Sequence, residues 1–529
     1  MSLVLYYCLK IANLATDHSM HTKTYCLRAM IISSFIACVA TFVSCDQKST
    51  LDVPASKLSS LSTKAGAGEG CDLGFFVTKD MVTAFLKMEK SDKAVLSVEG
   101  YPSEESPAMY VVNYEEGWKV FPADSRFGII LAENPKEHLN LWEKSDNEGF
   151  ELWMGSLQEQ IERFRGLPMD EYDESAVRFW DTLRPKPASR TEEILSSLRN
   201  NPRNRDLWAI IEVGTVYGDT TLANRNQLLS TKWGQGHPWN VSMPYVYDSL
   251  YMYDKICKAG SQAVAVGQVL KYFHGASSIP SGLYHQVSEA SRAPVYSSGV
   301  LLGVTLTLNR SNFTSNSSRW NQMSSDCPSL PHVPTSGDEY VSDFLLDIGA
   351  RLGTMYNIYY SYTNTDVNGY LDLSPTNLSY SQAVYNSSMV NTVVSNLSNW
   401  SPVIMSAKNY GPGYHYFWVI DGYQHKQYYT QTNYESWPIS MLYEMYSYDQ
   451  FTLVNVMGEE ALAGLYPNYY PGMSFYTRED YNDYLEYHMN WGNDGYNDGM
   501  FSAYSSGWNG YTIDTRVYYN LVPGELIIN

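Results

Sequence analysis

The sequence predicts an α+β fold, in which strands and helices follow one another within the same domains. Three observations support this class. Short stretches that alternate apolar and polar residues, at 109–114, 117–124 and 127–132, are typical of strands. Helical periodicity is visible at 80–86 and 151–164. Hydrophobic residues make up 44% of the chain and charged residues 17%, so the chain can bury a large core.

The length and the charge of the chain exclude several classes of protein. Its 529 residues are enough for about two to four domains. The net charge of −20 argues against a nucleic-acid partner, because phosphate binding requires a basic surface. Seven cysteines are too few for a disulfide scaffold. The aromatic content of 14%, with 45 tyrosines, suits an extracytoplasmic protein that contacts other polymers.

Residues 1–45 are predicted to be an export signal. An apolar run at 29–43 follows two basic residues; it is short for a membrane span and typical of a secretory signal. The run ends in a lipobox-like segment, which predicts a lipoprotein anchored to the membrane only through Cys45. Simple cleavage, which yields a freely secreted protein, is the alternative. We therefore expect an exported protein at the outer cell surface or on the membrane, with a flexible tether at 46–74.

Three regions follow the tether. Residues 75–165 carry the strand and helix patterns described above, and they predict a small α+β domain. Residues 166–221 hold several prolines and many charges, which predicts a linker with one helix near 191–199. From 222 to 529 the chain is rich in Tyr, Trp and Gly and poor in charge, and we expect it to form the main domain.

Four segments of the main domain carry chemical information. They are LLSTKWGQGHPWN at 228–240, AGSQAVAVGQVLKY at 259–272, WVIDGY at 418–423 and HMNWGNDG at 488–495. In this order they resemble the streptopain family of bacterial cysteine peptidases, which has a two-lobed papain-like fold. The 75–165 domain resembles the inhibitory propeptide of that family. The resemblance therefore implies a papain-like domain at 222–529 that is preceded by a propeptide-like domain.

The spacing of these segments suits a nucleophile held at the start of a helix. A thiol attacks an amide only as the thiolate, and the N-terminus of a helix stabilises that anion. A histidine on a facing strand takes the proton and later gives it to the leaving amine. The resemblance implies that Gln235 donates to the developing oxyanion, that Asn490 orients the histidine, and that Trp491 shields the pair from water.

The two central residues of the family are replaced in this chain. The cysteine position, seven residues before Gln268, holds Ser261, and the histidine position, five residues before Asp421, holds Tyr416. A serine hydroxyl needs an adjacent base, and a tyrosine, with a pKa near 10, is a poor base at neutral pH. The sequence therefore predicts an inactive peptidase homologue that binds a peptide or protein ligand in its cleft, together with its own propeptide-like domain.

An active peptidase is the alternative hypothesis. His415 precedes Tyr416 and faces away on a regular strand, but a β-bulge near Gly413 would turn it back. Ser261 or Cys257 would then be the nucleophile of a secreted endopeptidase made as a zymogen, although a buried structural role suits Cys257 better. A third hypothesis is a structural or adhesive surface lipoprotein that no longer uses the cleft.

The main domain also carries a long insertion. About 60 Tyr-rich residues, at 424–485, separate two strands that are close in sequence in the family, and a helix is predicted at 438–447. We expect an insertion at this place to lie near the cleft, as a cap or as a new binding face. No set of His, Cys or acidic residues has metal-ligand spacing, so the sequence predicts neither a metal nor another cofactor.

Overall fold

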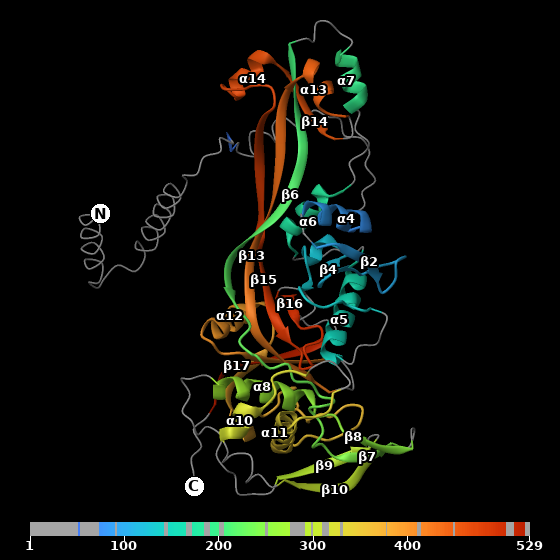
Figure 1. Cartoon of the computed structure of the whole chain (residues 1–529), viewed down its shortest axis with the longest axis vertical. Helices are drawn as coiled ribbons and strands as arrows, with labels where there is room; N and C mark the ends of the chain where they lie inside the picture. The colour runs from blue at the N-terminus through green and yellow to red at the C-terminus, as the bar shows by residue number, and fades with distance from the viewer. Residues whose placement is uncertain are drawn as a thin grey trace, which may run out of the picture. The chain divides into compact units, whose positions relative to one another are not determined.

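The computed structural model describes most of the chain beyond residue 73 (Figure 1). The described residues are 51–52, 74–89, 93–141, 147–165, 172–184, 191–199, 206–248, 252–275, 291–297, 300–308, 317–327, 332–376, 378–409, 414–447, 450–503 and 513–523. The chain divides into two units, Met1–Asp52 and Val53–Asn529, and of the first unit only strand β1 (Leu51–Asp52) is described. The predicted signal peptide, its lipid anchor at Cys45 and nearly all of the tether lie outside the described residues. Among the helices that the structure describes, none combines the length and the apolar character of a membrane span.

Residues 75–165 fold as an antiparallel sheet, β5-β4-β3-β2, with two helices. The elements are α4 (Lys79–Met88), β2 (Val95–Tyr101), β3 (Met109–Tyr114), β4 (Trp118–Pro122), the 3-10 helix η1 (Ser125–Phe127), β5 (Ala132–Asn134) and α5 (Glu148–Phe164). Both predicted helices and the first two predicted strands are confirmed. Thr78 caps α4 by accepting a hydrogen bond from the backbone of Met81, which explains why the helix begins at this point.

The strand predicted at 127–132 is wrong over most of its length, because β5 begins only at its last residue. The Asp124 side chain accepts a hydrogen bond from the backbone N–H of Arg126 at 3.1 Å, which turns the chain into η1. Gly128 follows at a φ of +104°, which side chains rarely tolerate. Ile130 is only 2% exposed, so the apolar residues in this segment indicated burial rather than a strand.

The rest of the chain supplies the other strands and helices. The strands are β6 (Leu207–Arg225), β7 (Tyr245–Asp248), β8 (Tyr253–Ile256), β9 (Ser291–Ser297), β10 (Val300–Leu308), β11 (Leu378–Val384), β12 (Val403–Asn409), β13 (Tyr416–Pro438), β14 (Thr452–Gly458), β15 (Met473–Asn490), β16 (Gly499–Ser502) and β17 (Ile513–Pro523). The helices are α6 (Glu174–Thr182), α7 (Thr191–Arg199), α8 (Ser261–Gly275), α10 (Ser317–Gln322), α11 (Ser336–Leu352), η3 (Ser374–Thr376), η4 (Ser387–Met389), α12 (Val390–Ser398), α13 (Ile439–Met445) and α14 (Glu459–Leu465).

One sheet joins both regions in the order β11-β17-β12-β13-β15-β16-β5-β4-β3-β2. Strand β13 separates two cores, because its residues alternate between the faces of the sheet. Phe417 and Val419 pack with α8 and α11 on one face, which we call the α8 face. Tyr416 and Trp418 pack with α5 and α12 on the other face, the α5 face. The predicted α+β class is therefore confirmed.

Helices α8 and α11 pack closely on the α8 face. A Cβ at Gly267 of α8 would lie 2.8 Å from a side-chain carbon of Leu345 in α11, so only glycine allows this approach. Thr335 and Asp338 form a capping box at the start of α11, and Gly353 ends the helix at a φ of +73°. This support fixes α8, and with it the residue at its first turn.

The predicted linker at 166–221 holds ordered structure. Helix α7 confirms the helix predicted within it, but residues 207–221 belong to the long strand β6, so the linker prediction is wrong there. Trp208 and Ile210 pack into one small core and Ile211 into another. Because both faces of the strand are buried at this end, the apolar run shows no alternation that would mark it as a strand.

The insertion at 424–485 lengthens strands β13 and β15, and β6 pairs alongside β13. We call β6, together with the parts of β13 and β15 between residues 424 and 485, the strand extension. We call α7, α13, β14 and α14 at its end the head (Figure 1). Helix α13 confirms the helix predicted at 438–447. Ser436 pairs with Met473 beside the head, and from there β15 runs to Asn490, roughly 55 Å at the rise of a strand. The expectation that the insertion lies near the cleft is therefore wrong for the head.

Candidate functional site

Ser261 is the first residue of helix α8, where the family's nucleophile is expected. Gly260 precedes it at a φ of +93°, a conformation that favours glycine and turns the chain into the helix. The Ser261 hydroxyl donates to Gln262 Oε1 at 3.4 Å and accepts from the backbone N–H of Phe417 at 3.1 Å. The residue is only 5% exposed. The hydroxyl is therefore engaged by backbone and amide groups, none of which is a base.

Tyr416 is the first residue of strand β13 and lies on the α5 face. Its phenol donates to the backbone carbonyl of Trp491 at 2.8 Å, and it is 5% exposed. Burial raises the pKa of Tyr416 far above its ordinary value, and a hydrogen bond from the Gln235 side chain only partly offsets this. Ser261 bonds the backbone of the next residue along β13, so the structure brings the two positions together without a hydrogen bond between their side chains.

Gln235 lies in the segment that leads to α8. Its carbonyl accepts a hydrogen bond from the backbone N–H of Ala259 at 2.9 Å, which ties this loop to the turn before the helix. The residue is 9% exposed, and its side-chain amide acts to lower the pKa of the Tyr416 phenol. The amide that the resemblance assigns to the oxyanion therefore lies beside the tyrosine.

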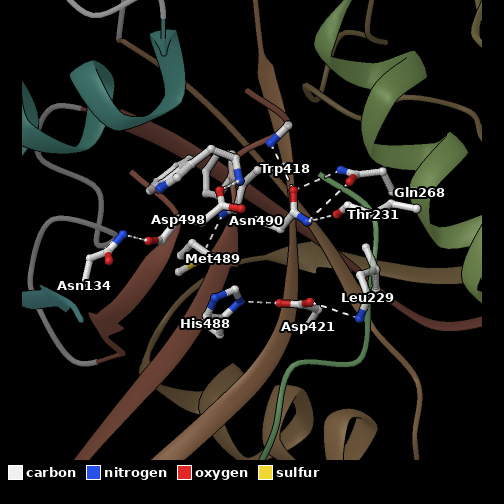
Figure 2. Close-up of polar contacts among 12 residues, drawn as sticks. Asn134, Leu229, Thr231, Gln268, Trp418, Asp421, His488, Met489, Asn490 and Asp498 are labelled. Carbon is white, nitrogen blue, oxygen red and sulfur yellow. Dashed lines mark hydrogen bonds and ion pairs between the residues drawn. The ribbon is translucent and has the colours of Figure 1, made fainter. Parts of the chain in front are cut away.

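Asn490 ends strand β15 and bonds to helix α8 (Figure 2). Its Oδ1 accepts from Gln268 Nε2 at 3.0 Å, and its Nδ2 donates to the Thr231 carbonyl at 2.9 Å. Gln268 Oε1 in turn accepts from the backbone of Trp233 at 3.3 Å. The side chain predicted to orient a base therefore connects β15 to α8 and to the loop before it, and it makes no hydrogen bond to Tyr416 or His415.

Trp491 is fully buried beside Tyr416. Its indole N–H donates to the Asn497 carbonyl at 3.0 Å, and its ring lies 5.1 Å from that of Trp418. Helix α5 covers both side chains. A Cβ at Gly149 would lie 2.6 Å from the Tyr416 ring and 2.7 Å from the Trp491 ring, so glycine is needed at this point of the helix.

His415 lies on the opposite side of the strand from Tyr416, as strand alternation predicts. The β12–β13 pairing is regular from Tyr416 onward, and Gly413, near which a bulge would turn the histidine back, lies outside the described residues. The ring is directed at Ser406, with Nδ1 3.3 Å from its Oγ, and at Asp514, with Nε2 3.9 Å from a carboxylate oxygen. Burial lowers the pKa of His415 to about 4. No hydrogen bond joins it to Ser261.

Cys257 is a member of the core on the α8 face. It is completely buried, and burial raises the pKa of its thiol to about 12. Asn240 donates to its backbone carbonyl at 3.0 Å. These contacts are those of a structural cysteine, whose thiolate is not populated at neutral pH.

Two buried acidic residues near the site, Asp421 and Asp498, make polar contacts that the sequence motifs did not predict. His488 Nδ1 lies 2.6 Å from Asp421 Oδ1, and the other carboxylate oxygen accepts from the backbone of Leu229 at 3.1 Å (Figure 2). Burial acts to lower the pKa of His488, but the Asp421 carboxylate raises it above its ordinary value. The acidic residue of the WVIDGY motif was the available signal, since a buried carboxylate requires a partner. The pair fastens the loop before α8 to strands β13 and β15.

Asp498 is the second of these acidic residues. One of its carboxylate oxygens accepts from the backbone N–H of Trp491 at 2.9 Å, and the other has no hydrogen-bond partner among the described residues. Burial raises the pKa of Asp498 to about 7. In the described part of the chain, no group of three or more His, Cys, Asp or Glu side chains is arranged to hold a metal ion.

Comparisons with known proteins find two solved structures and one family model that are similar to parts of the chain. Two solved structures from Prevotella intermedia are similar: a fragment of prointerpain A is 15% identical, with 82% of this chain and all of that chain covered at a TM-score of 0.44. Active interpain A is 16% identical, with 56% of this chain and 95% of that chain covered at a TM-score of 0.34. No curated protein sequence matches the chain. Residues 233–437, which hold Gln235, Ser261 and Tyr416, match the model of the Peptidase C10 family, so this region resembles the streptopain family as its motifs predict.

Proposed function

We propose that this protein is an exported homologue of the C10 peptidases that binds a peptide or protein partner without cleaving it. One observation carries the proposal. The side chain at the base position, Tyr416, is buried, donates a hydrogen bond to the Trp491 carbonyl and is covered by helix α5. A neutral phenol in this environment does not accept a proton from Ser261, and a serine hydroxyl without a base is not a nucleophile at neutral pH.

The alternative of an active peptidase has less support. His415 is directed at Ser406 and Asp514, and a base must come within hydrogen-bonding reach of the proton that it removes. Cys257 is buried in the core, and its raised pKa keeps it in the thiol form. Neither residue has the geometry that an active site needs.

Casein and a peptide-epoxide thiol trap test the absence of activity. We expect the purified mature chain, residues 46–529, to leave casein intact and the trap unreacted, while papain in a parallel reaction consumes both. Casein cleavage that disappears in Ser261→Ala or in Cys257→Ala would sink the proposal and establish the active alternative.

A gain-of-function variant tests whether Ser261 and Tyr416 are the cause of the expected inactivity. If the loss of reactivity is due to the two replaced side chains, Ser261→Cys combined with Tyr416→His should be alkylated by the small reagent iodoacetamide at neutral pH faster than Ser261→Cys alone. Casein is unsuitable here, because α5 covers the site. Ser261→Cys alone is the matched control, because it restores the thiol without a base and should react more slowly.

The binding role rests on surfaces that remain open. The Tyr416 ring is buried beneath helix α5, whereas the head exposes apolar side chains, among them Met445 at 53% and Leu465 at 42% exposure. Exposed apolar groups of this kind are typical of contact surfaces. We propose that a partner binds at the head as well as at the cleft, and that a lipid on Cys45 attaches the protein to the membrane.

A shortened variant tests the binding role. Because Ser436 pairs with Met473, a two-residue turn can replace 437–472 and close the strands as a hairpin. We expect peptides from a casein digest to bind the immobilised mature chain and to bind the shortened chain at least tenfold more weakly. Equal binding by both chains would exclude the head, and no binding by either would favour the structural or adhesive hypothesis.

A further inference from the structure

The 75–165 domain is joined to the rest of the chain by a shared sheet. Strand β5 pairs with β16, with Met500 opposite Glu133. The backbone of Ser502 also donates to the Leu131 carbonyl at 2.9 Å. The domain thus extends the edge of the papain-like sheet by strand addition, a mode of docking that uses backbone hydrogen bonds.

A first buried contact surface lies over the candidate site. The Phe150 ring of α5 lies 6.4 Å from that of Trp491, and the Trp153 ring lies 4.9 Å from that of Phe501. All four side chains are at most 2% exposed. Large aromatic side chains contribute most to the stability of an interface when they are fully removed from water. This surface therefore holds α5 firmly over Tyr416.

A second buried contact surface lies on the strand extension. The Phe85 ring of α4 lies 4.6 Å from that of Tyr217 in β6 and 5.8 Å from that of Phe179 in α6. Tyr428 of β13 and Tyr484 of β15 belong to the same core. These partners come from the segment predicted as a linker and from the insertion, where the chain departs from the family pattern. The 75–165 domain is thus held by parts of the chain that the family pattern does not include.

Buried charges cross the same junction. Lys426 Nζ lies 2.8 Å from Glu133 Oε1 and 3.3 Å from Glu486 Oε2. Burial acts to lower the pKa of Lys426 and to raise that of Glu133, but the opposite charges prevail in both cases. Lys119 lies 3.5 Å from the same Glu133 carboxylate. If the domain separated, Lys426 and Glu486 would stay in the rest of the chain without Glu133. Separation is therefore unfavourable, because a largely buried charge would lose a partner.

We infer that the 75–165 domain is a permanent part of the folded protein and that the insertion at 424–485 serves to hold it in place. A releasable propeptide needs to contact only the cleft that it blocks. Here the domain has a second surface on the strand extension, a shared sheet and a buried ion pair. The inference does not depend on the reactivity of Ser261, because it rests on the junction alone.

A cut between the two parts tests this inference. A specific protease site can replace residues 166–171, so that one cut separates the domain from α6 and everything after it. We expect the two fragments of the nicked mature chain to co-elute in gel filtration, with an exchange time against a labelled 46–165 fragment of about a day or longer. Release of the N-terminal fragment during the run would overturn the inference.

Matched variants test the role of the strand extension. Tyr217→Ala removes the ring that contacts Phe85 and leaves the sequence of the 75–165 domain unchanged, so we expect exchange of the nicked protein to accelerate at least tenfold. Tyr253→Ala is the control, since this tyrosine is 54% exposed. Exchange rates that are equal in the two variants would contradict a holding role for the strand extension, whatever the result of the casein assay.

Discussion

The two halves of the candidate site differ in how far they depart from the family pattern. On the α8 face, Ser261 stands at the first turn of its helix behind a glycine of positive φ, and the surroundings still suit a nucleophile. On the α5 face, Tyr416 has become part of a core that includes Trp491 and helix α5. The first position therefore keeps the surroundings of a helix start, whereas the second lies in a domain interface.

Truncation of the tyrosine should have the largest effect. Tyr416→Ala leaves a cavity among Trp491, Trp418 and α5, and we expect a loss of about 3–5 kcal/mol in the free energy of unfolding, as for other large aromatic side chains in cores. Urea unfolding monitored by tryptophan fluorescence measures it. Tyr416→Phe keeps the ring and should lose about 1 kcal/mol, the usual contribution of one hydrogen bond. A loss in Tyr416→Ala no larger than this would show that the position is not part of the core.

Asp498 and His415 should make opposite contributions to the pH dependence of the free energy of unfolding. The pKa of Asp498, on the α5 face, is raised to about 7, so between roughly pH 4 and 7 the folded state holds a proton that the unfolded state has lost. The contribution of Asp498 to the free energy of unfolding therefore falls as the pH rises. The pKa of His415, on the α8 face, is lowered to about 4, so from about pH 4 to 6.5 only the unfolded state holds the proton, and stability rises with pH.

Thermal unfolding at several pH values separates the two groups. Relative to the wild type, Asp498→Asn should become more stable as the pH rises from 4 to 7, and His415→Gln less stable from 4 to 6.5, each by roughly 2–4 kcal/mol. Asp343→Asn, at an exposed position, is the control and should follow the wild type. Parallel curves for all four proteins would contradict the burial of these groups.

Because α5 contacts Tyr416, the effects of Gly149→Ala and Tyr416→Ala on stability should not be additive. Gly149→Ala places a methyl group against the Tyr416 and Trp491 rings, and we expect it to destabilise the wild type by about 1–3 kcal/mol. In a Tyr416→Ala background the methyl group enters the space that the ring leaves, so the loss should largely vanish. A double-mutant cycle measures the coupling, and strictly additive losses would mean that α5 does not rest on the tyrosine.

Substitution of Ser261 should have the smallest effect on stability. Ser261→Ala removes the acceptor for the Phe417 N–H and should lower stability by only about 1 kcal/mol. Gln262→Ala, at the next and fully buried position, should lose more, because its amide also donates to Thr363 at 2.8 Å. If Ser261→Ala were as destabilising as Tyr416→Ala, the two halves of the site would not differ as we describe.

Much of the α8 face could be predicted from the sequence, because the evidence there is local. Ser261 and Gln268 lie within one helix and Gly260 directly precedes it, so their spacing is visible in the sequence. The opposite orientations of Tyr416 and His415 follow from strand alternation alone. Such patterns involve neighbours in the chain, which the sequence records directly.

The α5 face could not be predicted, because its partners are distant in the chain. Strand β5 has three residues and β16 has four, so neither shows a pattern, and their pairing joins residue 133 to residue 500. From the sequence alone, Gly149 is only a residue of low helix propensity. Its role is visible only in the structure, where the Tyr416 and Trp491 rings lie against it. The bond between Asn490 and Gln268 likewise depends on how α8 is placed against β15.

The pairing of β5 with β16 has a consequence for the fate of a damaged molecule. Loss of the 75–165 domain would open the backbone of β16 as an unprotected edge, beside Trp491 and Phe501, which are now fully buried. An exposed edge with adjacent aromatic groups is a template for pairing with another chain, and hence for aggregation. Proteolytic removal of the domain would therefore yield insoluble protein instead of a mature form, so solubility after a cut reports whether the domain has left.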